Sequence, residues 1–302
     1  MVCKGADMKI LNFGSLNLDF VYRMHTFIRP GETAAALSRN VVCGGKGLNQ
    51  SIALARSGAR VYHAGNVGKD GGPLLDLLQS AGVDISCIRE LDVPGGHTII
   101  QVSDSGENAI ILFPGANASA DHEQVRQVLG RFDAGDLLVL QNEVSCIPEL
   151  IREAKERGMR IAMNPSPVEG TERYPLHLLD FLFVNEDEAG YLAGNGEAAI
   201  VLRQKYPNTS LIITCGARGA WYLGADGTDV WQPAVPVFPV DTTAAGDTFM
   251  GTFLALWSMG RDIPECLSTA AHAASLCILK PGAAPSIPEM AEVLQFMKQQ
   301  AK

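Results

Sequence analysis

The sequence lacks any long apolar run, since no hydrophobic stretch approaches the roughly 20 residues that a membrane-spanning helix needs. Its first residues, MVCKGADMK, contain no apolar core of a secretory signal. There is no block of basic residues, and the net charge of the 302 residues is −9. We therefore expect a cytoplasmic protein without membrane or nucleic-acid partners. A small anionic ligand is not excluded, because a local pocket can oppose the global charge.

Cysteine and histidine patterns that bind metal or form disulfides are also missing. The seven cysteines are scattered and never stand in C-x-x-C spacing, and the six histidines form no H-x-x-x-H pair. Free thiols in a reducing compartment are the simplest interpretation, and a structural zinc site is not expected. No G-x-G-x-x-G follows the first expected strand, which disfavours a dinucleotide-dependent oxidoreductase.

What the sequence does contain is a regular alternation of short apolar strands and helical segments. Residues 9–14 are expected to form a buried strand, and a helix that follows GGKG is expected to end at Gly58. The alternation continues through residues 136–141, 147–158 and 159–164. Such a pattern predicts an α/β fold with a doubly wound, mostly parallel central sheet flanked by helices. Ligands of these folds usually bind beyond the carboxyl ends of the strands.

Two segments interrupt this alternation, at approximately 17–41 and 94–114. Within the second, HTIIQVSDSGENAIILF predicts two strands joined by a turn at DSGEN. We expect the two insertions to pair into a small β-sheet lid beside the main sheet. Because no repeat, low-complexity segment or long linker is present, residues 1–302 are expected to form one domain.

The stretch DTTAAGDTFMGTF, residues 241–253, stands at a junction between an apolar run and a helical pattern. Apolar side chains recur at helical spacing from Phe249 to Trp257, so this helix should begin near Ala245. The small residues before it would let an anion such as phosphate approach the helix N-terminus. Asp247 in the first turn could accept a proton from an attacking hydroxyl, or it could simply complement the helix dipole.

Three further stretches could bind a ligand, and each has a purely structural alternative. CGGKGLNQS places glycines before a helix and Asn49 inside it, which suits either ligand contact or close packing. In GSLNLDF, Asn17 and Asp19 lie on one side of an extended chain, as sugar-binding groups or as a polar turn. In NEDEAG, Asn185 and Glu188 match a capping box, although the same residues could hold Mg²⁺ on nucleotide phosphates.

Taken together, these stretches resemble the signatures of the ribokinase-like carbohydrate kinases. GGKGLNQS and DTTAAGDTFMGTF are similar to the two signatures of the family, and GSLNLDF, QNE, NEDE, TCGARG and KPGAAPS follow its order across nearly the whole chain. The resemblance implies ATP-dependent phosphorylation of the primary hydroxyl of a small sugar, with ribose first. Fructose, deoxyribose, an adenosine-type nucleoside and a non-catalytic sugar- or nucleotide-binding protein are the alternatives. The intact Asp247 favours the kinase, because a pure binder needs no base beside phosphate.

The resemblance also implies a role for each matching residue. Asp247 would be the general base, and the anion hole for the transferring phosphate would be Ala244, Ala245 and Gly246. The sugar would be held by Asn17, Asp19, Gly45, Lys46, Asn49 and Glu143. The nucleotide and its Mg²⁺ would be held by Asn185 and Glu188, with Thr214 and Gly216 lining the nucleotide site. An activating K⁺ would be bound by Asp241, Thr243, Cys277, Lys280, Gly282 and Ser286.

This sequence departs from the usual family pattern in the expected lid. PGGHTIIQV places His97 and Thr98 where small apolar residues usually face the sugar, and Leu48 stands where alanine is frequent. These changes put ribose itself in doubt, and His97 could be either a solvated strand residue or a reader of a sugar hydroxyl. Family members often dimerise through the lid sheet, so the resemblance also implies a homodimer.

Overall fold

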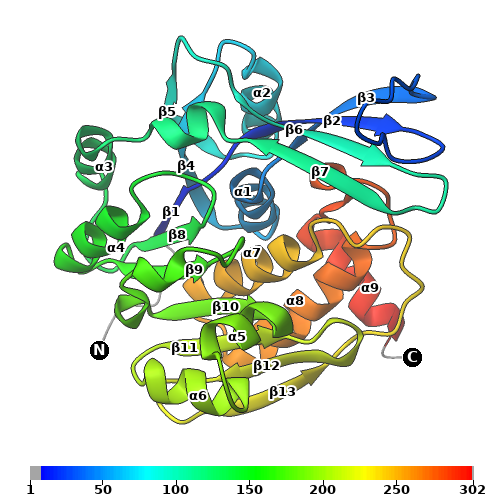
Figure 1. Ribbon diagram of the computed structural model, residues 1–302. Coiled ribbons are helices and arrows are strands. Elements are labelled where there is room, and N and C mark those ends of the chain that lie inside the picture. The colour runs from blue at the N-terminus through cyan, green and yellow to red at the C-terminus, as the bar shows by residue number, and fades with distance from the viewer. Residues whose placement is uncertain (1–7, 301–302) are drawn as a thin grey trace.

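The computed structural model describes residues 8–300, and a nine-stranded sheet forms its centre (Figure 1). All pairings from β5 across the sheet to β11 are parallel, and only β12 and β13 run antiparallel. The predicted α/β fold with a mostly parallel central sheet is therefore confirmed. In spatial order the strands are β13 (Asp229–Pro233), β12 (Gly219–Leu223), β11 (Ser210–Thr214), β10 (Phe181–Asn185), β9 (Arg160–Asn164), β8 (Leu137–Gln141), β1 (Lys9–Phe13), β4 (Arg60–Val67) and β5 (Asp84–Glu90).

Helices cover both faces of this sheet, and two separate apolar clusters fill the layers between. One face carries α1 (Lys46–Arg56), α2 (Gly72–Ser80), α7 (Ala245–Ser258), α8 (Ile263–Cys277) and α9 (Met290–Gln300). The other carries α3 (His122–Leu129), α4 (Ile147–Glu156), α5 (Glu186–Ala193) and α6 (Ala198–Lys205). Short 3₁₀ turns are η1 (Gly115–Ser119), η2 (Thr171–Arg173), η3 (Leu176–Leu178), η4 (Gly216–Arg218) and η5 (Ala284–Ser286).

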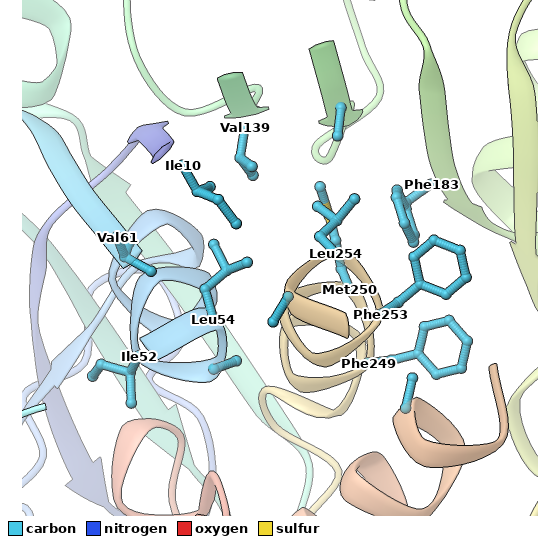
Figure 2. Packing of buried hydrophobic residues seen from close by; sticks show 14 of the residues in the cluster. Ile10, Ile52, Leu54, Val61, Val139, Phe183, Phe249, Met250, Phe253 and Leu254 are labelled. Atoms are coloured by element: carbon cyan, nitrogen blue, oxygen red, sulfur yellow. The ribbon is translucent and has the colours of Figure 1, made fainter. Parts of the chain in front are cut away.

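Two parallel helices, α1 and α7, lie side by side under the centre of the sheet (Figure 2). Fully buried Phe253 of α7 packs against Phe183 of β10, with 5.5 Å between the centroids of the two rings. The helices approach so closely at Gly251 that a Cβ there would lie 2.5 Å from the Cβ of Ala53. Only glycine fits this contact, and the contact places the first turns of the two helices next to each other.

The strands that interrupt the alternation form a separate four-stranded sheet, called here the small sheet. Its order is β3 (Ser38–Gly44), β2 (Asn17–Arg23), β6 (Gly96–Val102) and β7 (Asn108–Phe113). It projects from the main body beside α1 (Figure 1). The hairpin predicted within the second insertion is confirmed, because β6 and β7 pair antiparallel with a turn closed by Ser103 N–H donating to Glu107 O at 3.0 Å.

Residues 8–300 contain no helix that is both long and apolar enough to cross a bilayer. Within this part of the chain, His, Cys, Asp and Glu side chains nowhere form a group of three or more that could hold a metal ion. The six cysteines from Cys43 to Cys277 are free thiols, as predicted, whereas Cys3 lies outside the described residues.

Candidate active site

The site lies at the carboxyl ends of the strands, where the order of the sheet reverses. After β1 the chain places β4 and β5 on one side of it, and later places β8 through β11 on the other. Loops that leave neighbouring strands in opposite directions leave a crevice at such a point. Asn17 follows β1 and Glu143 follows β8, and the N-termini of α1 and α7 open toward the same place.

Asp247 occupies the centre of this crevice. Helix α7 begins at Ala245, as predicted, and is preceded by Ala244 in the left-handed region with φ 62°. Asp247 is therefore in the first turn, yet only 8% of it is exposed. Its Oδ1 accepts a hydrogen bond from Gln50 Nε2 at 2.9 Å, and its Oδ2 accepts one from Asn49 Nδ2 at 3.1 Å. The carboxylate is thus held between α1 and α7.

A cavity of about 260 Å³ opens on one side of Asp247. Its polar walls come from the carboxyl ends of three parallel strands, β9, β10 and β11, and from the turn that starts α7. N–H groups in the first turn of a helix have no acceptor within the helix, so this wall can bind an anion. The lining residues are Lys46, Asn164, Ser166, Phe183, Val184, Asn185, Glu188, Thr214, Thr242, Ala244, Ala245, Gly246, Asp247, Phe249 and Met250. Gly216 lies beyond this lining, in η4.

The capping box predicted at the start of α5 is confirmed. Asn185 Oδ1 accepts from Glu188 N at 2.8 Å, and Glu188 Oε2 accepts from Asn185 N at 2.9 Å. Asn164 Nδ2 also approaches Glu188 Oε2, at 3.4 Å. Both capping residues also line the cavity, so their structural role does not remove them from it.

Strand β2 carries Asn17 and Asp19 at alternate positions, so both side chains project from one face of the small sheet, as the extended spacing predicts. Burial raises the pKa of Asp19 above its usual value, and the hydrogen bond that Thr98 Oγ1 donates to its Oδ1 at 2.5 Å partly opposes this. Asn17 Oδ1 accepts from Asn117 Nδ2 at 2.8 Å. These polar groups are fixed before any ligand binds.

His97 and Thr98 lie on opposite faces of the small sheet. Adjacent strand residues point to opposite faces, and Thr98 points to the face of Asp19. His97 therefore lies on the opposite face, where its ring centroid is 5.9 Å from that of Phe20 and 5.0 Å from that of Phe113. His97 is part of an aromatic cluster with Phe20 and Phe113, on the face of the small sheet that also carries Leu18.

The loop after β8 and the start of α1 are joined through Glu143. Its carboxylate accepts hydrogen bonds from the Ser15 hydroxyl and, at 3.1 Å, from Lys46 N. Gly45 before the helix has φ 98°, and a Cβ there would lie 2.9 Å from Ser15 O, so no other residue fits without strain. Burial raises the pKa of Glu143, although the charge of Lys46 opposes this effect.

Lys46 brings the positive charge of the site. Burial alone would lower the pKa of its ammonium group, but the nearby carboxylates of Asp247, Glu143 and Glu188 raise it above its usual value. Lys46 lines the cavity together with the α7 turn. The structure therefore places Lys46 near Glu143, a predicted sugar residue, and near Glu188, a predicted nucleotide residue.

The residues that the resemblance assigns to a monovalent cation lie before α7 and at and after the C-terminal end of α8, in two segments that touch each other. Asp241 Oδ1 accepts from Thr243 N at 2.9 Å and from its hydroxyl at 2.6 Å, and Oδ2 accepts from Gly282 N at 2.9 Å. Burial raises the pKa of Asp241, but these hydrogen bonds outweigh it and hold the pKa below its usual value. Cys277 Sγ lies 3.0 Å from Ser286 Oγ. Lys280 Nζ pairs with Glu292 at 3.1 Å.

Several polar residues of the site were not anticipated as functional. Asn117 fixes Asn17 and accepts from Leu16 N at 3.0 Å, but it lies in η1 and no sequence pattern marks it. Asn164 could have been found as the polar residue that ends an apolar strand. Gln50 and Gln141 stand inside the motifs GGKGLNQS and QNE, yet neither was singled out.

His63 of β4 is fully buried near the site, and burial lowers its pKa from 6.5 to about 4. The unfolded chain binds the proton more readily, so stability is complete above pH 6.5 and is lost as the pH falls toward 4. We expect this histidine to account for about 3 kcal/mol of the free energy of unfolding that is lost as the pH falls. Urea unfolding at pH 7 and pH 5 should show a smaller pH dependence for His63→Gln, whereas the exposed control His122→Gln should behave like the native protein. An unchanged slope in His63→Gln would contradict this assignment.

Comparison with known proteins gives consistent matches over nearly the whole chain. Residues 7–290 match the pfkB family carbohydrate kinases. A ribokinase of Haemophilus influenzae is 33% identical over 298 residues, which cover 94% of this chain and 97% of that protein. The structure of a ribokinase of Thermotoga maritima has a TM-score of 0.88 at 30% identity, covering 96% of this chain and 99% of that one. Arabidopsis thaliana ribokinase complexed with ribose and ATP has a TM-score of 0.87 at 26% identity, covering 97% and 99%.

Proposed function

The chain belongs to the pfkB family of carbohydrate kinases, and from this premise we propose that it transfers the γ-phosphate of ATP to the primary hydroxyl of ribose. The observation that carries the proposal is Asp247, a carboxylate buried at a helix N-terminus, which lines a polar cavity and accepts hydrogen bonds from the amides of Asn49 and Gln50. A residue that only complements a helix dipole has no need of burial or of two amide donors. A proton acceptor beside a phosphate site accounts for both.

In the proposed mechanism, Asp247 takes the proton of the sugar hydroxyl as its oxygen attacks the γ-phosphorus. The bond from that phosphorus to the bridging oxygen breaks, and ADP leaves. Ala245 N–H already donates to Thr242 O at 3.3 Å, so the Gly246 N–H stabilises charge on the transferring group, and the ammonium of Lys46 adds a positive charge beside it. Positioning and charge stabilisation of this kind supply most of the catalysis in phosphoryl transfer.

We assign the holding of Mg²⁺, as part of MgATP, to Asn185 and Glu188. Amide and carboxylate oxygens suit this hard cation, and both residues line the cavity on the side of Asn164. Bound Mg²⁺ would neutralise charge on the phosphates. Thr214, from the end of β11, lines the same cavity and would contact the nucleotide.

Ribose is the first choice of sugar because most of the similar relatives are named ribokinases, against one deoxyribokinase at 28% identity, and one ribokinase structure is a complex with ribose and ATP. The residues present suit a polyhydroxyl ligand. Asn49 Oδ1 is buried without a partner among the described residues, so it has an acceptor to offer. Asp19 and Asn17 add a carboxylate and an amide, and the small sheet would act as a lid over them.

The proposal is tested by measuring ADP release with MgATP over ribose, 2-deoxyribose, fructose and adenosine. We expect ribose to give the highest kcat/KM. A higher value for another compound would reject ribose but keep the kinase. No turnover with any sugar or nucleoside, combined with measurable sugar binding by calorimetry, would instead support a non-catalytic binding protein.

We further propose that K⁺ activates the enzyme from the two loops that hold Asp241 and Ser286. Their approach to the start of α7 would let a bound cation polarise the anion-binding turn. Replacing Na⁺ by K⁺ at constant ionic strength should raise kcat severalfold in the native protein, and Asp241→Asn should lose most of this response. Equal rates in the two salts would remove the cation from the mechanism.

We also propose that two copies of the chain form a homodimer through the small sheet. Strand β7 exposes a continuous apolar row, with 55% of Ile110, 61% of Ile111, 48% of Leu112 and 45% of Phe113 accessible. An edge strand of this kind is normally covered. Light scattering should give a dimer mass for the native protein and a monomer mass for Ile111→Lys. Ile200→Lys, which alters a similarly exposed residue on α6, serves as the control and should remain dimeric. A native monomer at micromolar concentration would contradict the proposal.

A further inference from the structure

The buried amide groups behind Asp247 form one connected hydrogen-bonded chain. Gln50 is 1% exposed and donates from Nε2 to Asp247 Oδ1 at 2.9 Å. Gln141, fully buried at the end of β8, donates from its own Nε2 to Gln50 Oε1 at 2.7 Å. The same Nε2 donates to Asn12 Oδ1 at 2.9 Å. The chain therefore runs from β1 through β8 and α1 to the carboxylate.

The orientation of every amide in this hydrogen-bonded chain follows from Asn12, at the end farthest from Asp247. Asn12 Nδ2 lies 2.8 Å from Gly47 O, and a carbonyl oxygen can only accept, so Asn12 must present its NH₂ group there. Its oxygen then faces Gln141, which must present an NH₂ group in turn. Gln50 consequently offers its oxygen to Gln141 and its NH₂ group to Asp247. No amide in the chain can flip without opposing two donors or two acceptors.

A buried histidine extends the same chain on the other side of Asn12. Ser51 Oγ accepts from Asn12 Nδ2 at 2.9 Å and lies 2.7 Å from His63 Nδ1. His63 Nε2 faces Gly14 O at 3.3 Å, so this nitrogen carries the proton and Nδ1 accepts from the Ser51 hydroxyl. A neutral imidazole with its proton on Nε2 therefore satisfies the donors and acceptors at this end of the hydrogen-bonded chain as well.

Asn49 and Gln50 are neighbours on α1, but their polar atoms are used differently. Asn49 donates to Asp247 Oδ2 and keeps a buried Oδ1 that has no partner among the described residues, as expected of a ligand-binding group. Gln50 uses both ends of its amide within the protein. Its contribution must therefore act through Asp247.

We propose that Gln50 is a positioning residue for phosphoryl transfer: its amide, oriented by Gln141, holds the plane of the Asp247 carboxylate in the orientation that accepts the proton. The torsion that turns a carboxylate about its Cβ–Cγ bond is soft, so an unheld group samples a broad range of orientations. The donor on Oδ1 removes this freedom and leaves Oδ2, on the side of Asn49, to face the sugar. The inference rests on the proposed role of Asp247 as the base.

Removing the donor without changing the volume tests this directly. Gln50→Met should lower kcat about 10- to 100-fold, with the sugar KM within about threefold, because the geometry of the proton acceptor is lost while the sugar contacts stay. Gln124→Met is the matched control. Gln124 is an equally buried amide on α3 whose Nε2 donates to Gly65 O and Asn66 Oδ1, and it is not part of the hydrogen-bonded chain that ends at Asp247. The kcat of Gln124→Met should stay within about twofold of the native value, even if its melting temperature falls as far as that of Gln50→Met.

A second variant separates hydrogen bonding from packing. In Gln50→Glu, a protonated carboxyl can still donate to Asp247, whereas the ionised form places two negative charges side by side. The ratio of kcat for Gln50→Glu to native should therefore rise as the pH is lowered from 8.5 to 6, while the ratio for Gln50→Met stays flat. The other ionisable groups that bear on this site, namely Lys46, Glu143, Glu188 and His63, are the same in both variants.

The results for Asp247→Asn and Gln50→Met distinguish a failure of the proposed function from a failure of the positioning role alone. If Asp247→Asn retains turnover, the proposed function fails. If Asp247→Asn is inactive but Gln50→Met behaves like Gln124→Met, only the positioning role is wrong. Equal pH dependence of Gln50→Glu and Gln50→Met would also overturn it, because donation to the carboxylate would then have no effect on rate.

Discussion

Replacing Asp247 by asparagine is expected to lower kcat about 10³-fold while sugar and ADP affinities stay within about threefold. The amide cannot accept the proton, but it nearly keeps the shape of the carboxylate between Asn49 and Gln50. One of these two donors then faces an NH₂ group, so a stability loss of about 1–2 kcal/mol is expected as well. Steady-state ADP release, with calorimetric titration of ribose and ADP, separates the chemical effect from binding.

Glu265→Gln provides the control for the helix-dipole alternative. Glu265 is an acidic residue in the first turn of α8, as Asp247 is in α7, but it lies outside the site. Neutralising it should change stability by no more than about 1 kcal/mol and leave kcat unchanged. A kcat of Asp247→Asn within tenfold of native would mean that Asp247 is only such a dipole partner, and the mechanism would have to be abandoned.

Asp19→Ala is expected to raise the KM for the sugar about 10- to 200-fold, which corresponds to a lost hydrogen bond of a charged group worth about 1.5–3 kcal/mol. The half-buried carboxylate is already oriented by Thr98 Oγ1, so little ordering is required when a sugar hydroxyl binds. The KM for ATP should not change, because Asp19 is absent from the lining of the 260 Å³ cavity. Initial rates at varied ribose and saturating MgATP give the comparison.

Asp104→Ala is the control variant. Asp104 belongs to the turn of the same small sheet, but it is exposed, and its Oδ2 lies 2.7 Å from His25 Nδ1. It should leave both KM values unchanged. Thr98→Val should raise the sugar KM less than Asp19→Ala, because it removes the orienting group and keeps the carboxylate. An Asp19→Ala variant with an unchanged sugar KM would show that this face of β2 does not contact the sugar.

Features that depend on a few neighbouring residues could be predicted from the sequence. The start of α7 at Ala245, the capping box of Asn185 and Glu188, and the hairpin between β6 and β7 all follow from interactions within about five residues. The parallel sheet also follows, because alternating strands and helices leave few other arrangements. Individual residue roles came from resemblance rather than from these patterns.

The sequence by itself determined the order of the elements, the small-residue turn before Asp247 and the set of polar motifs at strand ends. Only the tertiary structure decided that Asp247 is buried between two parallel helices, that Thr98 rather than His97 joins Asp19, and that Gln50 is oriented by Gln141. The physical reason is distance along the chain. Helix starts and turns are governed by local backbone chemistry, whereas burial, strand register and the direction of an amide depend on groups that only folding brings together.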